Sequence, residues 1–238
     1  AVKLLNSPIL FYDILQFVKK LGVTGEEKTA LTHYLVFTSR LLSEPLSELV
    51  KGESSSGKSY VVGRVMLMFS KDTYRDLTDA TAQSFFYVPR DYFAHKIILI
   101  FEKHGSEKTD YSIRSLQSEK KLKLQVTIKD PETGQFVTNE KEVDGPVGFI
   151  STTTEAQVHA ENETRVLSIY PDESKQQTER ILEISDLKYR GLTGPTEAEI
   201  KKWQNIQRVL KPYPVFIPFV EQIRKIFPKE PVRVRRDY

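Results

Sequence analysis

One segment of the sequence restricts the fold more than any other, the eight residues G-E-S-S-S-G-K-S at positions 52–59. The spacing G-x-x-x-x-G-K-S is typical of loops that bind phosphate through backbone N–H groups at the start of a helix. A short apolar run, Leu46–Val50, precedes the segment, and a proline-free apolar run, Tyr60–Phe69, follows it. The order strand, loop and helix is the context in which this pattern forms a site. The alternative interpretation is a surface turn rich in serine and glycine.

The residues of this segment have different predicted roles. Lys58 is expected to reach the phosphate oxygens, and the Ser59 hydroxyl is expected to take one position around Mg²⁺. The backbone of the whole segment is expected to surround the phosphates. The predicted nucleotide-binding residues are therefore Gly52, Glu53, Ser54, Ser55, Ser56, Gly57, Lys58 and Ser59.

The composition of the 238 residues excludes several kinds of site. The sequence has no cysteine, which excludes disulfides and thiolate ligands, and its four histidines lack the spacing of a zinc site. No apolar run approaches the roughly 20 residues that span a bilayer, and no signal peptide is recognisable, so we expect a cytoplasmic protein without membrane association. The formal net charge of +3 is too small to indicate nucleic-acid binding by itself.

Hydrophobic periodicity and turn residues predict three parts. Residues 1–45 are expected to form helices, residues 46–185 an α/β core, and residues 186–238 a helical lid that is truncated in a chain taken from a longer protein. Two segments, Thr24–Glu27 and Thr196–Glu199, have the pattern of a capping box at the start of a helix.

The most strand-like segment of the core is His95–Glu102, where five consecutive apolar residues indicate a parallel strand buried on both faces. Its last residue, Glu102, stands where a carboxylate that organises Mg²⁺ or activates water is expected; the alternative is a solvent-exposed strand end. Further core strands are predicted at Val147–Ile150, which runs into the polar residues Ser151–Thr154, and at Arg165–Tyr170.

A β-hairpin is predicted to interrupt the alternation of strands and helices. Apolar and polar residues alternate strictly from Lys121 to Lys129, a turn follows at Asp130–Gly134, and a second strand is predicted at Gln135–Val143. The basic face of the first strand carries the predicted DNA-binding residues Lys121, Lys123 and Lys129. These lysines either contact nucleic-acid phosphates or pair with acidic residues across the hairpin.

In this order the parts resemble those of AAA+ ATPases, in the branch with a β-hairpin before the sensor-1 strand that includes the minichromosome maintenance helicases. They are most similar to the helicase-like module of primase-type proteins of bacterial mobile elements. The resemblance depends on Gly52–Ser59, Lys96–Glu102, Lys129–Gly134, Gly145–Pro146, Thr152–Thr154 and Glu161–Arg165. It implies a three-layer αβα phosphate-loop NTPase core with an inserted hairpin, flanked by N-terminal helices and a C-terminal lid.

The resemblance also implies ligands and residue roles. ATP and Mg²⁺ would be bound, with Ser59 and Glu102 at the metal and Glu102 orienting the attacking water. Thr153 or Thr154 would contact the γ-phosphate or the water. Arg165 would be an arginine finger that reaches the nucleotide of a neighbouring subunit.

The family's strand usually ends in two acidic residues, and here it ends in Phe101–Glu102, so slow hydrolysis, or binding without turnover, is expected. An internal salt bridge with Glu161 or Glu163 is the alternative for Arg165. The resemblance implies a sensor-2 arginine among Arg233, Arg235 and Arg236, and a solvent-exposed or phosphate-contacting tail is the alternative.

The sequence therefore predicts the ATP-hydrolysing module of a DNA helicase or translocase for replication of a mobile element. The expected partners are single-stranded or forked DNA and further copies of the chain in a hexameric ring. The alternatives are a nucleotide-dependent loader or remodelling switch with weak hydrolysis, and a small-molecule kinase with a phosphate-binding loop.

Overall fold

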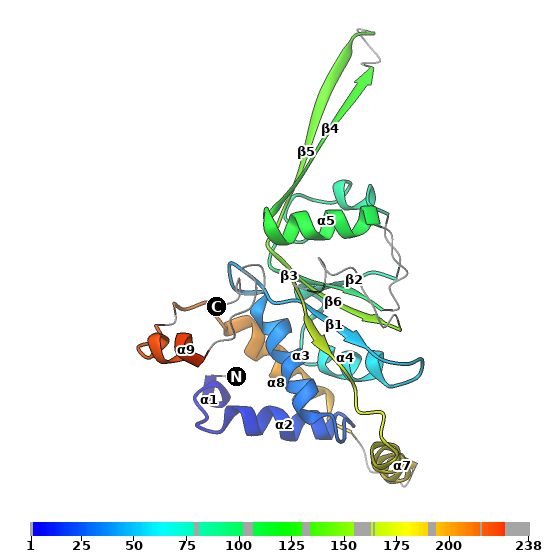
Figure 1. Cartoon of the computed structure of the whole chain (residues 1–238), viewed down its shortest axis with the longest axis vertical. Coiled ribbons are helices and arrows are strands. Elements are labelled where there is room, and N and C mark those ends of the chain that lie inside the picture. The colour runs from blue at the N-terminus through cyan, green and yellow to red at the C-terminus, as the bar shows by residue number, and fades with distance from the viewer. Residues whose placement is uncertain are drawn as a thin grey trace.

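A five-stranded parallel sheet forms the centre of the protein in the computed structural model (Figure 1). The structure describes residues 2–78, 81–101, 107–129, 134–154, 163, 165–189, 194–214 and 216–226. The strands of the sheet are β1 (Glu48–Lys51), β2 (Tyr74–Asp76), β3 (Lys96–Ile100), β6 (Val147–Thr153) and β7 (Leu167–Ile169). They lie in the order β2-β3-β6-β1-β7, and all four neighbouring pairs are parallel.

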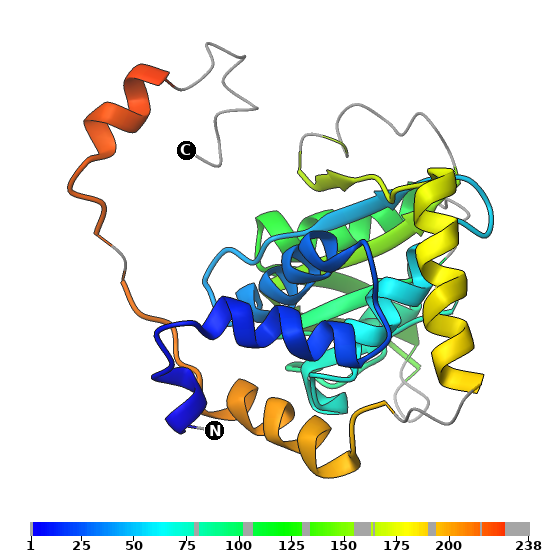
Figure 2. The same cartoon turned by 90° about the horizontal axis from the view of Figure 1, so that it is seen from below.

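Helices lie on both faces of this sheet. The helices of the described residues are α1 (Val2–Leu5), α2 (Leu10–Lys20), α3 (Glu27–Ser39), α4 (Lys58–Met66), α5 (Glu107–Ser118), α7 (Lys175–Tyr189), α8 (Glu197–Val209) and α9 (Val220–Ile226), with two 3₁₀ turns at Lys71–Thr73 and Ser84–Phe86. Helix α9 lies away from the sheet, and none of its residues is buried (Figure 2). One hydrophobic cluster joins α2, α3, α4 and α8 to one face, and a second joins α5 and the base of the hairpin to the other. The protein is thus a mixed α/β structure, compatible with a three-layer arrangement. No helix within the described ranges is long and apolar enough to cross a membrane.

The buried strand predicted before Glu102 is confirmed as β3. Its apolar residues Ile97–Ile100 are all buried, because β3 lies inside the sheet with helices on both faces. β6 is longer than predicted and continues to Thr153, since its polar end is buried and hydrogen-bonded: Ser151 Oγ donates to the carbonyl oxygen of Ile100 at 2.9 Å. β7 is shorter than the predicted 165–170 strand.

The predicted hairpin is present and projects from the body of the molecule (Figure 1). β4 (Lys121–Lys129) pairs with β5 (Phe136–Asp144) in antiparallel register, with Lys121 opposite Asp144 at the base and Lys129 opposite Phe136 at the tip. The connecting residues 130–133 lie outside the described ranges.

One of the two predicted capping boxes forms. At the start of α8, Thr196 accepts a hydrogen bond from the Glu199 N–H, and the Glu199 side chain accepts one from the Thr196 N–H. The box predicted at Thr24–Glu27 is wrong: α3 begins at Glu27 without a side-chain cap. The chain turns there through Gly25, whose φ is +75°, and the Gln177 amide of α7 bonds the Thr24 carbonyl oxygen at 2.6 Å.

Helix α8 packs against the N-terminal helices. Trp203 lies with its ring centroid 5.3 Å from that of Phe17 on α2, and both are buried in the cluster that also contains β1 and β3 residues. Arg40, just after α3, donates hydrogen bonds to the Gln207 side chain at 2.9 Å and to its carbonyl oxygen at 3.3 Å. The predicted first and last parts of the chain therefore share a core with the sheet, and the boundaries near 45 and 185 stay a prediction.

Tyr34 of α3 belongs to this core, and the titration of its hydroxyl makes the free energy of unfolding depend on pH. It is 5% exposed, and burial raises the pKa of its hydroxyl to about 12. Desolvation favours the neutral phenol, so the folded protein holds a proton that an unfolded chain releases near pH 10. The contribution of Tyr34 to stability is complete below pH 10 and is lost as the pH rises through the pKa of the folded state, about 12.

We expect the free energy of unfolding to fall by about 2 kcal/mol through this group between pH 10 and pH 12. Urea unfolding over that range would measure the loss, and Tyr34→Phe should lack it. Tyr213→Phe is the matched control, because it removes the same hydroxyl from a side chain that is 75% exposed. An unaltered slope in Tyr34→Phe would contradict the assignment.

Candidate nucleotide-binding site

The central strand β1 supports the candidate site and carries a buried charged residue at each end. Glu48 and His33 of α3 are both 0% exposed, and His33 Nδ1 lies 2.6 Å from Glu48 Oε1. Lys51, at the other end, is 2% exposed and bonds the Glu163 carboxylate. This hydrogen bond raises the pKa of Lys51. Buried charges require such partners, so both ends of β1 are fixed in register.

The glycine-rich loop (residues 52–57) leaves the carboxyl end of β1. Its first residue extends the pairing with β6, because the Gly52 N–H donates to the Thr153 carbonyl oxygen at 3.3 Å. Ser55 and Gly57 have positive φ values of 66° and 86°, and α4 begins directly afterwards at Lys58. Two left-handed residues turn the chain so that the free N–H groups of the first turn of α4 lie beside the loop.

The Lys58 side chain lies inside the loop and forms hydrogen bonds with its backbone. Its ammonium donates to the carbonyl oxygens of Gly52, at 2.8 Å, and of Glu53, and lies 3.3 Å from Ser56 Oγ. The residue is only 7% exposed. A cation held among loop atoms next to a helix N-terminus is an arrangement suited to anions, and phosphate is the anion that such loops recognise.

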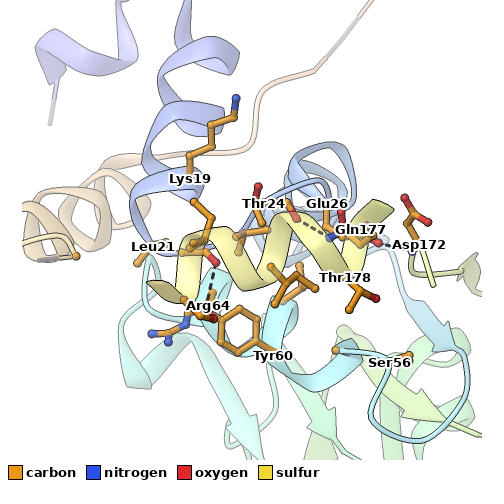
Figure 3. A pocket seen from close by; sticks show the side chains of 18 of the residues that line it. Lys19, Leu21, Thr24, Glu26, Ser56, Tyr60, Arg64, Asp172, Gln177 and Thr178 are labelled. Carbon is orange, nitrogen blue, oxygen red and sulfur yellow. Dashed lines mark hydrogen bonds between the residues drawn. The ribbon is translucent and has the colours of Figure 1, made fainter. Parts of the chain in front are cut away.

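A cavity of about 1020 Å³ opens beside the loop (Figure 3). It lies between the glycine-rich loop, the segment after α2 and the helix α7. The Tyr60 hydroxyl donates to the Gly22 carbonyl oxygen at 3.2 Å, and the Arg64 guanidinium lies 4.7 Å from the Tyr60 ring centroid. The volume is at the upper end of the range for small-molecule sites, and the lining joins polar groups to apolar side chains such as Ile181.

The other side of the cavity is formed by the start of α7. No sequence pattern predicted that this helix lines the site. Gln177, 3% exposed, reaches the Thr24 carbonyl, and Glu26 accepts a hydrogen bond from the Asp172 N–H. Figure 3 shows these side chains gathered at one side of the cavity. Gly25 permits the approach, because a Cβ there would lie 1.8 Å from the Gln177 oxygen. No local pattern relates residues about 150 positions apart.

Several predicted site residues lie at the same edge of the sheet. Thr153 ends β6 and is paired in register with Lys51, so it lies at the carboxyl edge from which the glycine-rich loop leaves. Thr154 follows it and is exposed. Ser59 lies in the first turn of α4 and is also exposed. Glu102, two residues after the last residue of β3, lies outside the described residues, and its predicted role stays a prediction.

Arg165 lies at the opposite edge of the sheet. It precedes β7 by two residues, and the first residue of β7, Leu167, donates from its N–H to the Ser47 carbonyl oxygen just ahead of β1. The Arg165 guanidinium donates to Ser118 Oγ at the end of α5. The structure therefore does not bring Arg165 to the glycine-rich loop of its own chain. The proposed sensor-2 residues Arg233, Arg235 and Arg236 lie outside the described residues.

The hairpin lysines differ in their surroundings. Lys121 donates to Glu142, which also accepts from Arg90 at 3.2 Å, so cross-strand pairing holds at the base of the hairpin. Lys123 faces Glu142 in the register, whereas Lys129 lies at the tip opposite Phe136, which is 77% exposed. The predicted DNA contacts of the three lysines stay a prediction.

Comparison with known proteins identifies no family for this chain. No protein-family model matches it, and no curated protein sequence matches it. The functional assignment therefore depends on the geometry described above.

The loop conformation itself can be tested with two glycines. Gly57 has a φ of +86°, so Gly57→Ala should destabilise the protein by about 1–2 kcal/mol even though a Cβ there meets no atom within 4 Å. Gly63→Ala is the matched control: Gly63 is inside α4, also with open space, and alanine there should stabilise by about 0.5–1 kcal/mol. Urea unfolding should show changes in the free energy of unfolding of opposite sign for the two variants. Equal changes would contradict the left-handed conformation of Gly57.

Proposed function

We propose that the chain is an ATP-binding and ATP-hydrolysing module of the AAA+ type, the motor part of a DNA helicase or translocase. The observation that carries the proposal is the path of the G-x-x-x-x-G-K-S segment. It leaves the carboxyl end of a central parallel strand, wraps around the Lys58 ammonium, enters α4 and borders a cavity of about 1020 Å³. Ligands of open α/β sheets bind at this edge of the strands.

The backbone path of the loop supports the binding of a nucleotide's phosphates. A Cβ at Gly52 would lie 2.9 Å from Ser56 Oγ and 3.0 Å from the Pro171 ring, so the backbone passes where only glycine fits. In the proposal, the N–H groups at the start of α4 and Lys58 hold the phosphates, and Ser59 holds Mg²⁺, which would neutralise phosphate charge. Thr153 or Thr154 would contact the γ-phosphate or the attacking water from the end of β6.

A second subunit is part of the proposal. Arg165 lies at the sheet edge away from its own glycine-rich loop, which supports a role at the nucleotide of a neighbouring copy in a ring, proposed to be hexameric. There it would stabilise the charge that develops when water attacks the γ-phosphate and ADP leaves. The projecting hairpin, with Lys121, Lys123 and Lys129, would contact the phosphates of single-stranded or forked DNA.

The alternative of a nucleotide-dependent loader or switch is favoured by one observation. Glu173, in the turn before α7, bonds the glycine-rich loop, and Gln177, in the first turn of α7, bonds the segment after α2, so occupation of the loop has a direct route to a helix on the surface. Strand separation by the assembled protein on a forked substrate distinguishes a motor from a switch.

Lys58→Ala should weaken the binding of ATP with Mg²⁺ at least tenfold, because the substitution removes the cation inside the loop. Isothermal titration calorimetry measures the affinity, with unfolding by urea as a check that the variant is folded. Lys202→Ala, at an exposed position on α8, is the matched control and should bind as the wild type does. Equal affinity in Lys58→Ala would overturn the proposed function.

Arg165→Ala should abolish ATP turnover by the assembled protein while leaving nucleotide affinity within about twofold, since the side chain acts on a neighbour's nucleotide. Phosphate release measures turnover, and titration measures binding. A variant that loses binding, or that turns over at the wild-type rate, would contradict the role across the subunit interface. Mixed assemblies of Arg165→Ala and Lys58→Ala chains should recover part of the activity, because some interfaces then pair an intact loop with an intact arginine.

A further inference from the structure

An acidic side chain from outside the glycine-rich loop accepts a hydrogen bond from one of the loop's backbone N–H groups. Glu173 lies between β7 and α7, and its Oε1 accepts a hydrogen bond from the Glu53 N–H at 3.0 Å. The same oxygen lies 2.8 Å from the position of a Cβ on Gly52. A carboxylate therefore rests against the part of the loop that begins the candidate phosphate site.

This contact and Lys58 hold the same residue from two sides. The Glu53 N–H is taken by Glu173, and the Glu53 carbonyl oxygen is taken by the Lys58 ammonium. Lys58 has to leave the carbonyl oxygens of Gly52 and Glu53 to reach a phosphate, and that movement changes the peptide groups that Glu173 contacts. A bound phosphate also brings negative charge close to a carboxylate, and like charges at this distance repel each other.

The segment that carries Glu173 is fixed at its other contacts. The Asp172 N–H donates to Glu26, which is 7% exposed, and Gln177 donates to the Thr24 carbonyl oxygen at 2.6 Å. The Ser174 side chain caps α7 by accepting from the Gln177 N–H at 3.2 Å. Because Glu173 lies in this turn, its bond to the Glu53 N–H is one of the contacts that hold the start of α7 in place, and its loss removes the contact with the loop.

We propose that Glu173 competes with the nucleotide's phosphates for the glycine-rich loop and thereby couples occupation of the loop to the position of α7. The inference rests on the proposed function, since it takes a phosphate-bearing ligand at this loop. Without ligand, Glu173 and Lys58 hold the loop closed. With ligand, the phosphates bind Lys58, Glu173 leaves the loop, and the start of α7, which has then lost its contact with the loop, shifts.

The first test measures affinity. Glu173→Gln and Glu173→Ala should bind ATP with Mg²⁺, and inorganic triphosphate, at least fivefold more tightly than the wild type in calorimetry. The control is Glu179→Gln, which removes the same charge from an exposed position on α7 and should change affinity less than twofold. Unchanged or weaker binding by both Glu173 variants would overturn the competition while leaving the proposed function intact. Absence of binding by the wild type and by both Glu173 variants would instead overturn the proposed function together with this inference.

The second test measures the movement of α7. The sequence has no cysteine, so a pair of spin labels can be introduced through Lys28→Cys on α3 and Glu183→Cys on α7, both at exposed positions. Adding inorganic triphosphate should shift the distance distribution between the labels. In the same pair with Glu173→Ala, the distribution without ligand should already lie closer to the ligand-bound one. A distribution that is unchanged by ligand, in a protein shown by calorimetry to be saturated, would overturn the coupling.

Discussion

The buried charges at the two ends of β1 determine where the rest of the site lies. Glu48 is in contact with His33, and Lys51 is bonded to Glu163, so a shift of the strand by one residue would leave two ionisable side chains without partners in the interior. Such a loss costs several kcal/mol, which is a large part of the stability of a domain. The glycine-rich loop begins directly after Lys51, and its place at the carboxyl edge follows from this register.

The candidate site combines short-range and long-range parts. The loop, Lys58 and the start of α4 come from one continuous segment whose conformation is set by Gly57 and Ser55. The opposite wall comes from the segment after α2 and from α7, which meet through Gln177 and Glu26. The glycine-rich loop and α7 therefore line one cavity, and the proposals of nucleotide binding and of α7 movement depend on the same contacts.

The sequence predicted elements whose signal is local and periodic. The alternation from Lys121 to Lys129 gave β4, five apolar residues gave β3, and the Thr196 capping box formed as expected. The same capping pattern failed at Thr24, because Gly25 takes a left-handed conformation and Gln177 bonds the Thr24 carbonyl oxygen. A capping pattern reports a local preference, and here a contact from a distant helix outweighed it.

By itself the sequence determined the glycine-rich loop, its lysine and the helix that follows, because these residues are adjacent in the chain and their spacing alone predicts their arrangement. Only the tertiary structure decided which groups surround that loop. It brought Thr153 to the same edge, put Arg165 at the opposite edge beside Ser118, and set Glu173 against the Glu53 N–H. These outcomes depend on strand order and on contacts between residues far apart in the chain, which no local pattern encodes.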